Sequence, residues 1–390
     1  MILPANRLNN VSEYYFSQKL KEVAQMNAEG KKVISLGIGS PDLPPLQATL
    51  DVMCEQTQRS DVHGYPPYEG IPELRKAFAD WYKDWYHVEL NPNTEIQPLI
   101  GSKEGILHIS MAFLNPGDGV LIPNPGYPTY SSVSKLLGAE LFYYDLEENN
   151  QWQPNFDALE KTDLSKVKLM WVNYPNMPTG APASLELFEK LVAFGKKHQI
   201  VICHDNPYSF ILSDKPLSIL NIEGAKDICI ELNSMSKSHN MPGWRIGLVT
   251  SNAQFISWIS KVKTNIDSGM FKPLQLAAAE ALRNTKEWHN EMNCIYLNRR
   301  KLAESIMRVL GCAFDEKQTG LFLWGKIPNK YETGKDLADK VLYEANVFLT
   351  PGFIFGSNGE KYIRISLCCN ETMLNEALER VRGIFNAKTL

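Results

Sequence analysis

Between residues 119 and 250, short apolar runs recur in the order expected for buried strands, and amphipathic segments separate some of them. The runs cover 119–123, 140–144, 167–172, 199–203, 227–232 and 244–250, and residues 184–198 form the clearest helix. This order predicts an α/β fold with a doubly wound, mostly parallel sheet. Sheets of this kind bind ligands at the carboxyl ends of their strands.

A second, smaller α+β unit is predicted toward the C-terminus. Its expected strands are 312–314, 321–324, 347–349 and 362–367, and its expected helices are 288–310, 334–345 and 372–385. An N-terminal segment, 1–45, holds an expected helix over 11–27 and a short strand over 33–36, and we expect it to pack with this unit. The predicted division is therefore 1–45, a large domain 46–285 and a small domain 286–390, and 390 residues suffice for two cores.

The composition excludes several classes of partner. The net charge is −4 and the sequence has no basic run, so nucleic acids and anionic membranes are not expected partners. No apolar run has the length of a membrane span or of a signal-peptide core. Seven cysteines without a C-x-x-C pair fit a reducing cytoplasm, and the seven histidines lack metal-ligand spacing, so we predict no metal site.

A polar stretch between two of the apolar runs carries the strongest chemical signal. Residues 234–247 read SMSKSHNMPGWRIG, with Lys237 among small hydroxyl residues and Arg245 eight positions later. A deprotonated lysine forms imines with carbonyl compounds, and the arginine fork binds phosphate. Ser234 and Lys237 also spell the S-x-x-K motif of penicillin-binding enzymes, but the sequence lacks the S-D-N and K-T-G motifs that those enzymes require.

Two glycine-containing segments suggest ligand contacts. Gly37 and Gly39 begin a G-x-G pattern after a strand, which would favour an NAD-dependent dehydrogenase. Asp42 occupies the place of the third glycine and prolines follow, so a rigid loop that brings the Gly39 backbone close to a ligand is the better interpretation. The segment 99–105 joins a strand to a helix expected over 106–114, and its backbone N–H groups form either an anion site or a simple helix cap.

Polar and aromatic residues follow several of the predicted strands, among them Tyr127, Asp205 and Tyr208. Together with Ser102, Lys237 and Arg245, in this order, they resemble the motifs of the class I and II aminotransferases, which are fold-type I enzymes dependent on pyridoxal 5′-phosphate (PLP). The resemblance runs from Gly39 to Arg364. It implies a ping-pong transfer of an α-amino group between an L-amino acid and a 2-oxo acid, on a large domain with a mostly parallel sheet and a smaller α+β domain.

The resemblance gives four residues a role at the cofactor ring. Lys237 resembles the lysine that holds PLP covalently and later moves a proton to and from the substrate Cα. Asp205 resembles the carboxylate that faces the pyridine nitrogen and keeps it protonated. Tyr208 resembles the donor to the phenolic oxygen, and Tyr127 the aromatic residue that stacks on the ring. Lys237, Asp205 and Tyr208 are thus the expected catalytic residues.

Phosphate binding is implied for Ser102, Lys103, Glu104, Ser234 and Arg245. Tyr65 resembles a tyrosine that reaches the phosphate of a neighbouring subunit, and 267–269 resembles a loop that also crosses. The resemblance therefore implies a homodimer with shared active sites. Arg364 resembles the arginine that binds the substrate α-carboxylate, with help from the backbone of Gly39.

The turn 173–180, NYPNMPTG, departs from the family pattern. The family has asparagine at the position of Met177, where its side chain donates to the phenolic oxygen of the cofactor. Neighbouring Asn176 could take over this contact and is the expected cofactor ligand here. A β-eliminating C–S lyase remains the alternative function, because the same lysine serves both reactions. Residues 265–269 resemble the diaminopimelate branch of these enzymes, and aspartate, aromatic and methionine donors also stay open.

Overall fold

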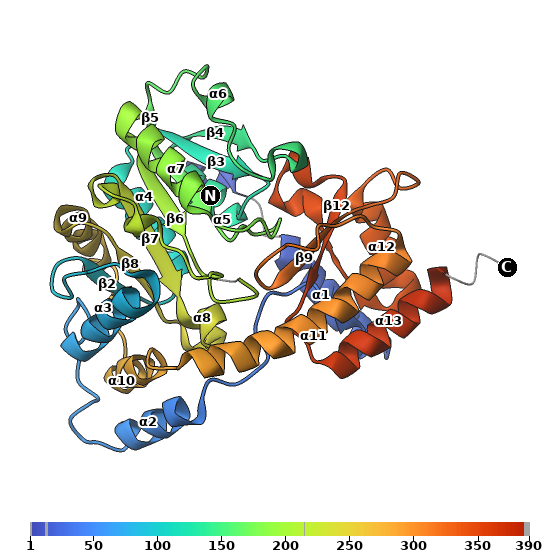
Figure 1. Cartoon of the computed structure of the whole chain (residues 1–390), viewed down its shortest axis with the longest axis horizontal. Coiled ribbons are helices and arrows are strands. Elements are labelled where there is room, and N and C mark those ends of the chain that lie inside the picture. The colour runs from blue at the N-terminus through green and yellow to red at the C-terminus, as the bar shows by residue number, and fades with distance from the viewer. Residues whose placement is uncertain (1, 12–14, 214, 386–390) are drawn as a thin grey trace.

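The computed structural model describes residues 2–11, 15–213 and 215–385, and it is built around a seven-stranded sheet (Figure 1). The strand order is β2-β8-β7-β6-β5-β3-β4. Its strands are β2 (Ile96–Leu99), β3 (Gly119–Asn124), β4 (Glu140–Asp145), β5 (Val167–Asn173), β6 (Val201–Asp205), β7 (Cys229–Ser234) and β8 (Gly247–Thr250). Only the two pairings of β8, with β2 and with β7, are antiparallel, so the predicted mostly parallel α/β sheet is confirmed.

Helices cover both faces of this sheet, as the continuous apolar runs require. The helices of this unit are α3 (Pro72–Tyr86), α4 (Ser102–Phe113), α5 (Pro128–Leu136), α6 (Phe156–Leu159), α7 (Leu185–His198), α9 (Ala253–Lys263), α10 (Lys272–Ala281) and α2 (Gln47–Thr57), of which α2 packs against α10. Successive residues of β5 show the two cores. Leu169 and Trp171 belong to the cluster under α4, α5 and α9, whereas Met170 and Val172 belong to the cluster under α3 and α7.

The second unit holds a three-stranded antiparallel sheet in the order β11-β12-β9. Its strands are β9 (Phe322–Lys326), β11 (Thr350–Pro351) and β12 (Tyr362–Ser366), and its helices are α11 (Lys286–Leu310), α12 (Gly334–Ala345) and α13 (Glu371–Phe385). Helix α11 runs from the large sheet to this unit (Figure 1). Among the described residues, no helix combines the length and the apolar character of a membrane span.

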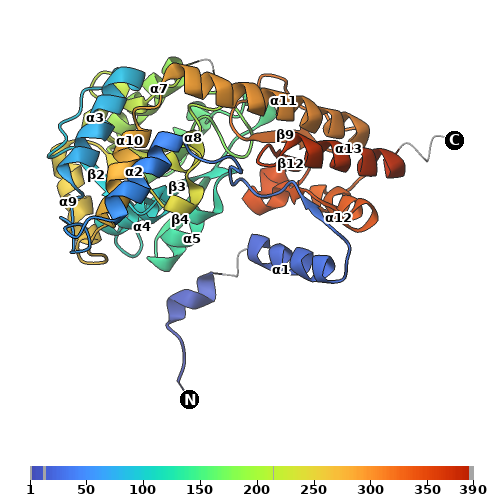
Figure 2. The same cartoon turned by 90° about the horizontal axis from the view of Figure 1, so that it is seen from below.

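The part of the N-terminal segment from α1 to β1 packs against the second unit (Figure 2), whereas the 3-10 helix Asn6–Asn10 contacts α5 of the large sheet. Strand β1 (Ile34–Ser35) pairs in parallel with β10 (Val347–Phe348), and α1 (Tyr15–Ala28) contributes Val23 to a small core with Leu342 of α12. Residues 12–14 of the helix expected over 11–27 lie outside the described residues. The domain boundaries 46–285 and 286–390 stay predictions.

Several element boundaries differ from the sequence prediction by a few residues, and the strand expected over 312–314 is only an isolated bridge between Ala313 and Lys326. Two of the shifted boundaries lie at residues with expected functions. Helix α4 begins at Ser102 rather than at residue 106, because Gly101 turns the chain with φ 77° directly before it. Strand β8 begins at Gly247 rather than at residue 244. The preceding residues form a 3-10 turn that begins at Pro242, and Arg245 follows in the left-handed region with φ 58°.

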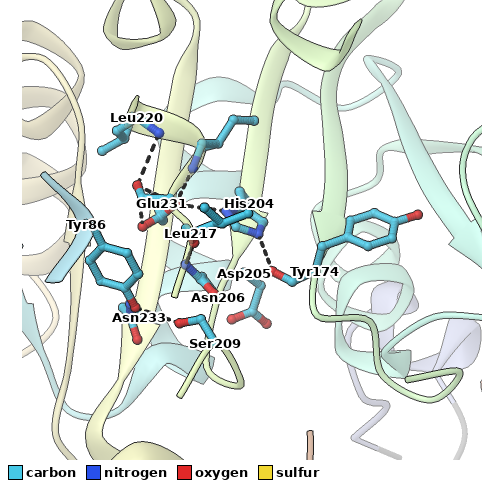
Figure 3. Close-up of polar contacts among 12 residues, drawn as sticks. Tyr86, Tyr174, His204, Asp205, Asn206, Ser209, Leu217, Leu220, Glu231 and Asn233 are labelled. Atoms are coloured by element: carbon cyan, nitrogen blue, oxygen red, sulfur yellow. Dashed lines mark hydrogen bonds and ion pairs between the residues drawn. The ribbon is translucent and has the colours of Figure 1, made fainter. Parts of the chain in front are cut away.

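A fully buried carboxylate, Glu231 of β7, collects hydrogen bonds from several elements (Figure 3). It accepts from the Tyr82 hydroxyl at 2.8 Å, from the Ser218 hydroxyl at 2.9 Å and from the backbone N–H of Ile219 at 3.0 Å. Its fourth partner is Nδ1 of His204, at 2.8 Å, on the neighbouring strand β6. These donors match the acceptor capacity of an ionised carboxylate.

The hydrogen bonds of His204 assign its charge. Its Nε2 lies 2.8 Å from the carbonyl oxygen of Tyr174, and a carbonyl only accepts, so Nε2 carries a proton. Its Nδ1 faces the ionised carboxylate of Glu231 and carries the second proton. His204 is therefore an imidazolium in a buried ion pair. This pair joins the strands β6 and β7 to the turn that follows β5.

We expect Glu231→Gln to lower the free energy of unfolding by about 3–5 kcal/mol, because it leaves the buried His204 charge without a counter-ion. Urea denaturation of the purified protein measures the change. The matched control is Glu186→Gln, which removes an exposed partner of Lys190 and should change stability by about 1 kcal/mol or less. Equal stability of the two variants would contradict the charged pair.

Candidate active site

A cavity of about 380 Å³ opens at the carboxyl ends of β5, β6 and β7, and residues of the second unit complete its wall. Ten of the predicted site residues line it: Gly39, Ser102, Lys103, Tyr127, Asp205, Tyr208, Ser234, Lys237, Arg245 and Arg364. They come from segments more than 300 positions apart in the sequence. Of the other three, Glu104 and Asn176 are not among the lining residues, and Tyr65 is an exposed side chain on the loop before α3.

Asp205 ends β6 and presents one unused oxygen. Its Oδ2 accepts from the Tyr130 hydroxyl at 2.8 Å, whereas Oδ1 has no hydrogen-bond partner among the described residues. Burial raises the pKa of Asp205 to about 6, and the bond from Tyr130 opposes part of this rise. Its carboxylate points away from the Glu231–His204 pair (Figure 3). Oδ1 of Asp205 can therefore accept a hydrogen bond, and none of the described residues donates one.

Lys237 lies on the single turn of helix α8 (Met235–Ser238), directly after β7. The Ser234 hydroxyl caps this turn by accepting from the backbone N–H of Ser236 at 3.2 Å. The Lys237 ammonium donates to the carbonyl oxygen of Gly39. Burial lowers the pKa of Lys237, and the nearby charges of Arg364 and Arg245 lower it further. A lowered pKa increases the fraction of neutral amine, which is the nucleophilic form.

The start of α4 and the guanidinium of Arg245 lie side by side at one end of the cavity. The first N–H groups of a twelve-residue helix point out of its N-terminus, and Ser102 and Lys103 there line the cavity. A Cβ at Gly101 would lie 2.2 Å from Nη2 of Arg245, so a larger residue would displace the guanidinium. A Cβ at Gly247 would lie 2.8 Å from the backbone nitrogen of Ser102. Gly247 is therefore required by its backbone contacts, and Gly101 is favoured by its φ of 77°.

Glu104 faces away from the cavity, toward a cluster of charged and titratable side chains formed by His108, Lys263 and Asp267. It accepts from the backbone N–H of Ile100 at 2.6 Å and lies 3.3 Å from the ammonium of Lys263. Burial acts to raise the pKa of Glu104, but His108 and Lys263 outweigh it and lower the pKa. Glu104, His108 and Asp267 are close enough to resemble a metal site. The buried ammonium of Lys263, which also pairs with Asp267, supplies the positive charge there.

Arg364 of β12 is held among aromatic rings at the second unit's side of the cavity. Its guanidinium carbon lies 3.8 Å from the ring centroid of Phe322 and 4.7 Å from that of Phe355. Its Nη2 donates to the carbonyl oxygen of Gly37 at 2.9 Å. Cation–π contacts and this bond fix the plane of the guanidinium. The arginine is thereby oriented before any ligand binds.

The turn after β5 places Met177, not Asn176, at the cavity. The sulfur of Met177 lies 3.2 Å from Nη1 of Arg364. The side chain of Asn176 is used within the turn, where Oδ1 accepts from Thr179 and Nδ2 donates to the carbonyl oxygen of Asn173. Met177 therefore occupies the expected position of the donor but cannot donate a hydrogen bond.

The aromatic residues of the wall include expected and unexpected members. Tyr127 packs edge-on against Tyr130, with ring centroids 5.5 Å apart, and Tyr208 packs against Phe322 at 5.9 Å. Burial raises the pKa of Tyr208 well above its usual value. The sequence analysis missed the following lining residues: Phe16, Tyr130, Phe322 and Phe355. Tyr130 follows Tyr127 by one helical turn and could have been found from that spacing, but no sequence signal marks the three phenylalanines.

Comparisons with known proteins identify the family of this chain. The family model described as aminotransferase class I and II matches residues 31–381. The LL-diaminopimelate aminotransferase of Dehalococcoides mccartyi strain CBDB1 is 42% identical over 97% of this chain and 98% of its own length. That of Nitratidesulfovibrio vulgaris strain Miyazaki F is 39% identical, over 97% of this chain and 98% of its own length.

A solved structure shares both the fold and the sequence pattern. Substrate-bound BacF from Bacillus subtilis is 37% identical and superposes with a TM-score of 0.93 over 98% of both chains. These matches confirm the fold expected from the sequence, and the curated relatives favour amino transfer over β-elimination. The chain belongs to the class I and II aminotransferase family and is an aminotransferase.

Proposed function

We propose that this aminotransferase uses PLP and moves an α-amino group between an L-amino acid and a 2-oxo acid by a ping-pong mechanism. The observation that carries the proposal is the meeting of three groups in one cavity. A lysine with a lowered pKa, a buried carboxylate oxygen without a partner and an anion site at a helix start lie together. An amine, an anion and a phosphate site are the contacts that an aldehyde-bearing, phosphorylated pyridine needs.

The residues present fit this cofactor. The unpartnered Oδ1 of Asp205 would accept from the ring nitrogen of the pyridine. The space that glycine leaves at position 101 admits the guanidinium of Arg245 to the phosphate end, beside the N–H groups of α4. Tyr127 and Tyr208 would contact the ring between these ends. Asn176 and Glu104 are not part of this set, because their side chains are engaged elsewhere.

Bound PLP supplies a carbonyl that takes up the amino group and a ring that withdraws electrons from the substrate. The protein supplies the proton transfers and the orientation. Lys237 would hold the cofactor and would move a proton at the substrate Cα. Asp205 would keep a proton on the ring nitrogen, because an adjacent carboxylate raises the pKa of that nitrogen. Arg364 binds the α-carboxylate, which amino acids and 2-oxo acids share.

We propose a homodimer and a cytoplasmic location. Tyr65 is 92% exposed, and such an exposed tyrosine fits a contact with a neighbouring subunit. Its loop lies against residues 267–269, because a Cβ added at Gly269 would lie only 3.2 Å from Pro66. All seven cysteines are free, which fits a reducing compartment. LL-diaminopimelate is one candidate donor, because the curated relatives are named for it.

Lys237→Ala should abolish amino transfer, since it removes both the covalent anchor and the proton carrier, while PLP still binds at the anion site. Borohydride reduction of the wild-type holoenzyme, followed by peptide mass spectrometry, should place the pyridoxyl group on Lys237. Lys301→Ala, which changes an exposed lysine of α11, serves as the control and should keep full activity. A pyridoxyl group on another lysine would refute the assignment.

Asp205→Asn should stabilise the apoprotein at pH 8 by up to about 3 kcal/mol. The folded-state pKa of Asp205, about 6, lies above its ordinary value of 3.8, so folding is penalised where this carboxylate must stay ionised. The penalty is full above pH 6 and disappears near pH 4, where the group is protonated in both states. Urea denaturation of both apoproteins at pH 8 and pH 4.5 measures this.

Adding PLP provides the control for the Asp205→Asn experiment. PLP should stabilise the wild-type protein more than Asp205→Asn, because only the carboxylate forms an ion pair with a protonated ring nitrogen. A stability difference between the apoproteins that does not depend on pH would contradict the role of Asp205 as an unpartnered anion.

A further inference from the structure

We propose that the amino acids handled by this enzyme carry a large, uncharged, apolar side chain, aromatic or aliphatic. The inference rests on the proposed function, because it concerns the part of the same cavity that lies beyond Arg364. The proposed substrates differ from LL-diaminopimelate, the compound for which the curated relatives are named. LL-diaminopimelate carries a second ammonium and a second carboxylate at the far end of its side chain.

Every charged side chain of the cavity wall already has a role. Five such residues line it: Lys103, Asp205, Lys237, Arg245 and Arg364. Asp205 and Lys237 serve the cofactor ring, Arg245 and Lys103 lie at the phosphate end, and Arg364 binds the α-carboxylate. The described part of the chain leaves no charge to pair with a charged substrate side chain. Burying a charge without a partner is strongly unfavourable.

Apolar side chains form the wall on the side of Arg364. Phe16 and Leu20 come from α1, Ile38 from the loop after β1, and Phe322 and Phe355 from the second unit. The rings of Phe322 and Phe355 are buried, but Leu20 and Ile38 remain 38% and 39% exposed. A substrate side chain placed against them would remove this apolar surface from water. The wall therefore favours a substrate with an apolar side chain.

The residues that we expect to cross from a neighbouring subunit, Tyr65 and 267–269, do not change this result. Tyr65 lies in the turn-rich segment 64–70, GYPPYEG, whose single charge is the exposed carboxylate of Glu69. In the other segment, the carboxylate of Asp267 is committed, because one oxygen pairs with Lys263 and the other accepts from the backbone N–H of Gly269. A dimer would bring the aromatic surface of Tyr65 to the cavity. The one charge beside it, the carboxylate of Glu69, would repel the second carboxylate of glutamate or LL-diaminopimelate.

Half-reactions of the holoenzyme test the proposal. Stopped-flow absorbance of the cofactor would give kcat/KM for L-phenylalanine, L-leucine, L-alanine, L-glutamate and LL-diaminopimelate. We expect phenylalanine or leucine to exceed alanine, glutamate and LL-diaminopimelate by at least tenfold. Calorimetry of unreactive ligands gives a second readout, in which 3-phenylpropanoate should bind at least tenfold more tightly than pentanedioate.

The two hypotheses fail in different ways. If none of the five amino acids reacts, the proposed function is wrong. If glutamate or LL-diaminopimelate reacts as well as the apolar donors, amino transfer stands and the substrate inference is overturned. If alanine reacts with a kcat/KM as high as that of phenylalanine and leucine, the substrate inference is also overturned.

A charge placed in the wall should reverse the preference. In Ile38→Arg we expect the ratio of kcat/KM for phenylalanine over glutamate to fall at least tenfold, because the guanidinium would pair with the second carboxylate. Leu20→Arg repeats the test from another element. Met373→Arg, on the exposed side of α13, is the matched control and should leave the ratio unchanged. An unchanged ratio in both wall variants would overturn the proposed position of the substrate side chain.

Discussion

The ion pair of Glu231 and His204 sets the arrangement on which the active site depends. The two residues are direct partners across β6 and β7, and the second N–H of His204 holds the turn after β5. These strands end at Asn173, Asp205 and Ser234, which all line the cavity. A slip of one residue would separate the buried charges and turn each strand-end side chain to the other face of the sheet. The pair therefore fixes register and site together.

Burial has opposite electrostatic effects on the two central groups of the cavity. It raises the pKa of Asp205 and lowers the pKa of Lys237, so each group is driven toward its neutral form. For Lys237 the shift is useful directly, because the neutral amine is the nucleophile. For Asp205 it is a cost that a protonated ring nitrogen would remove. The buried charge of Asp205 thus lowers the stability of the apoprotein at the place where the cofactor is proposed to bind, and the same charge would increase the affinity for the cofactor.

The sequence predicted those features that depend on local pattern and missed those that depend on distant packing. The β5 run was identified because strands buried on both faces read as continuous apolar segments, and Lys237 and Asp205 because a family motif marks them. Phe16, Phe322 and Phe355 carry no local signal, since only the meeting of three remote segments brings them to the cavity. The start of α4 was placed four residues late, because Gly101 at positive φ, and not a polar cap, begins it. Neither kind of information lies in a short window of sequence.

The G-x-G pattern near the N-terminus shows how packing can imitate a binding motif. A Cβ at Gly37 would lie 2.5 Å from the ring of Phe348, and a Cβ at Gly39 would lie 2.3 Å from the ring of Phe322. Both glycines are thus required by aromatic side chains of the second unit and not by a dinucleotide. Their carbonyl oxygens accept from Arg364 and Lys237, the proposed carboxylate-binding and cofactor-binding residues. Because the rings leave no space for side chains there, the backbone of this loop can reach both cations, and the same packing that builds the apolar wall also orients the two charged groups beside it.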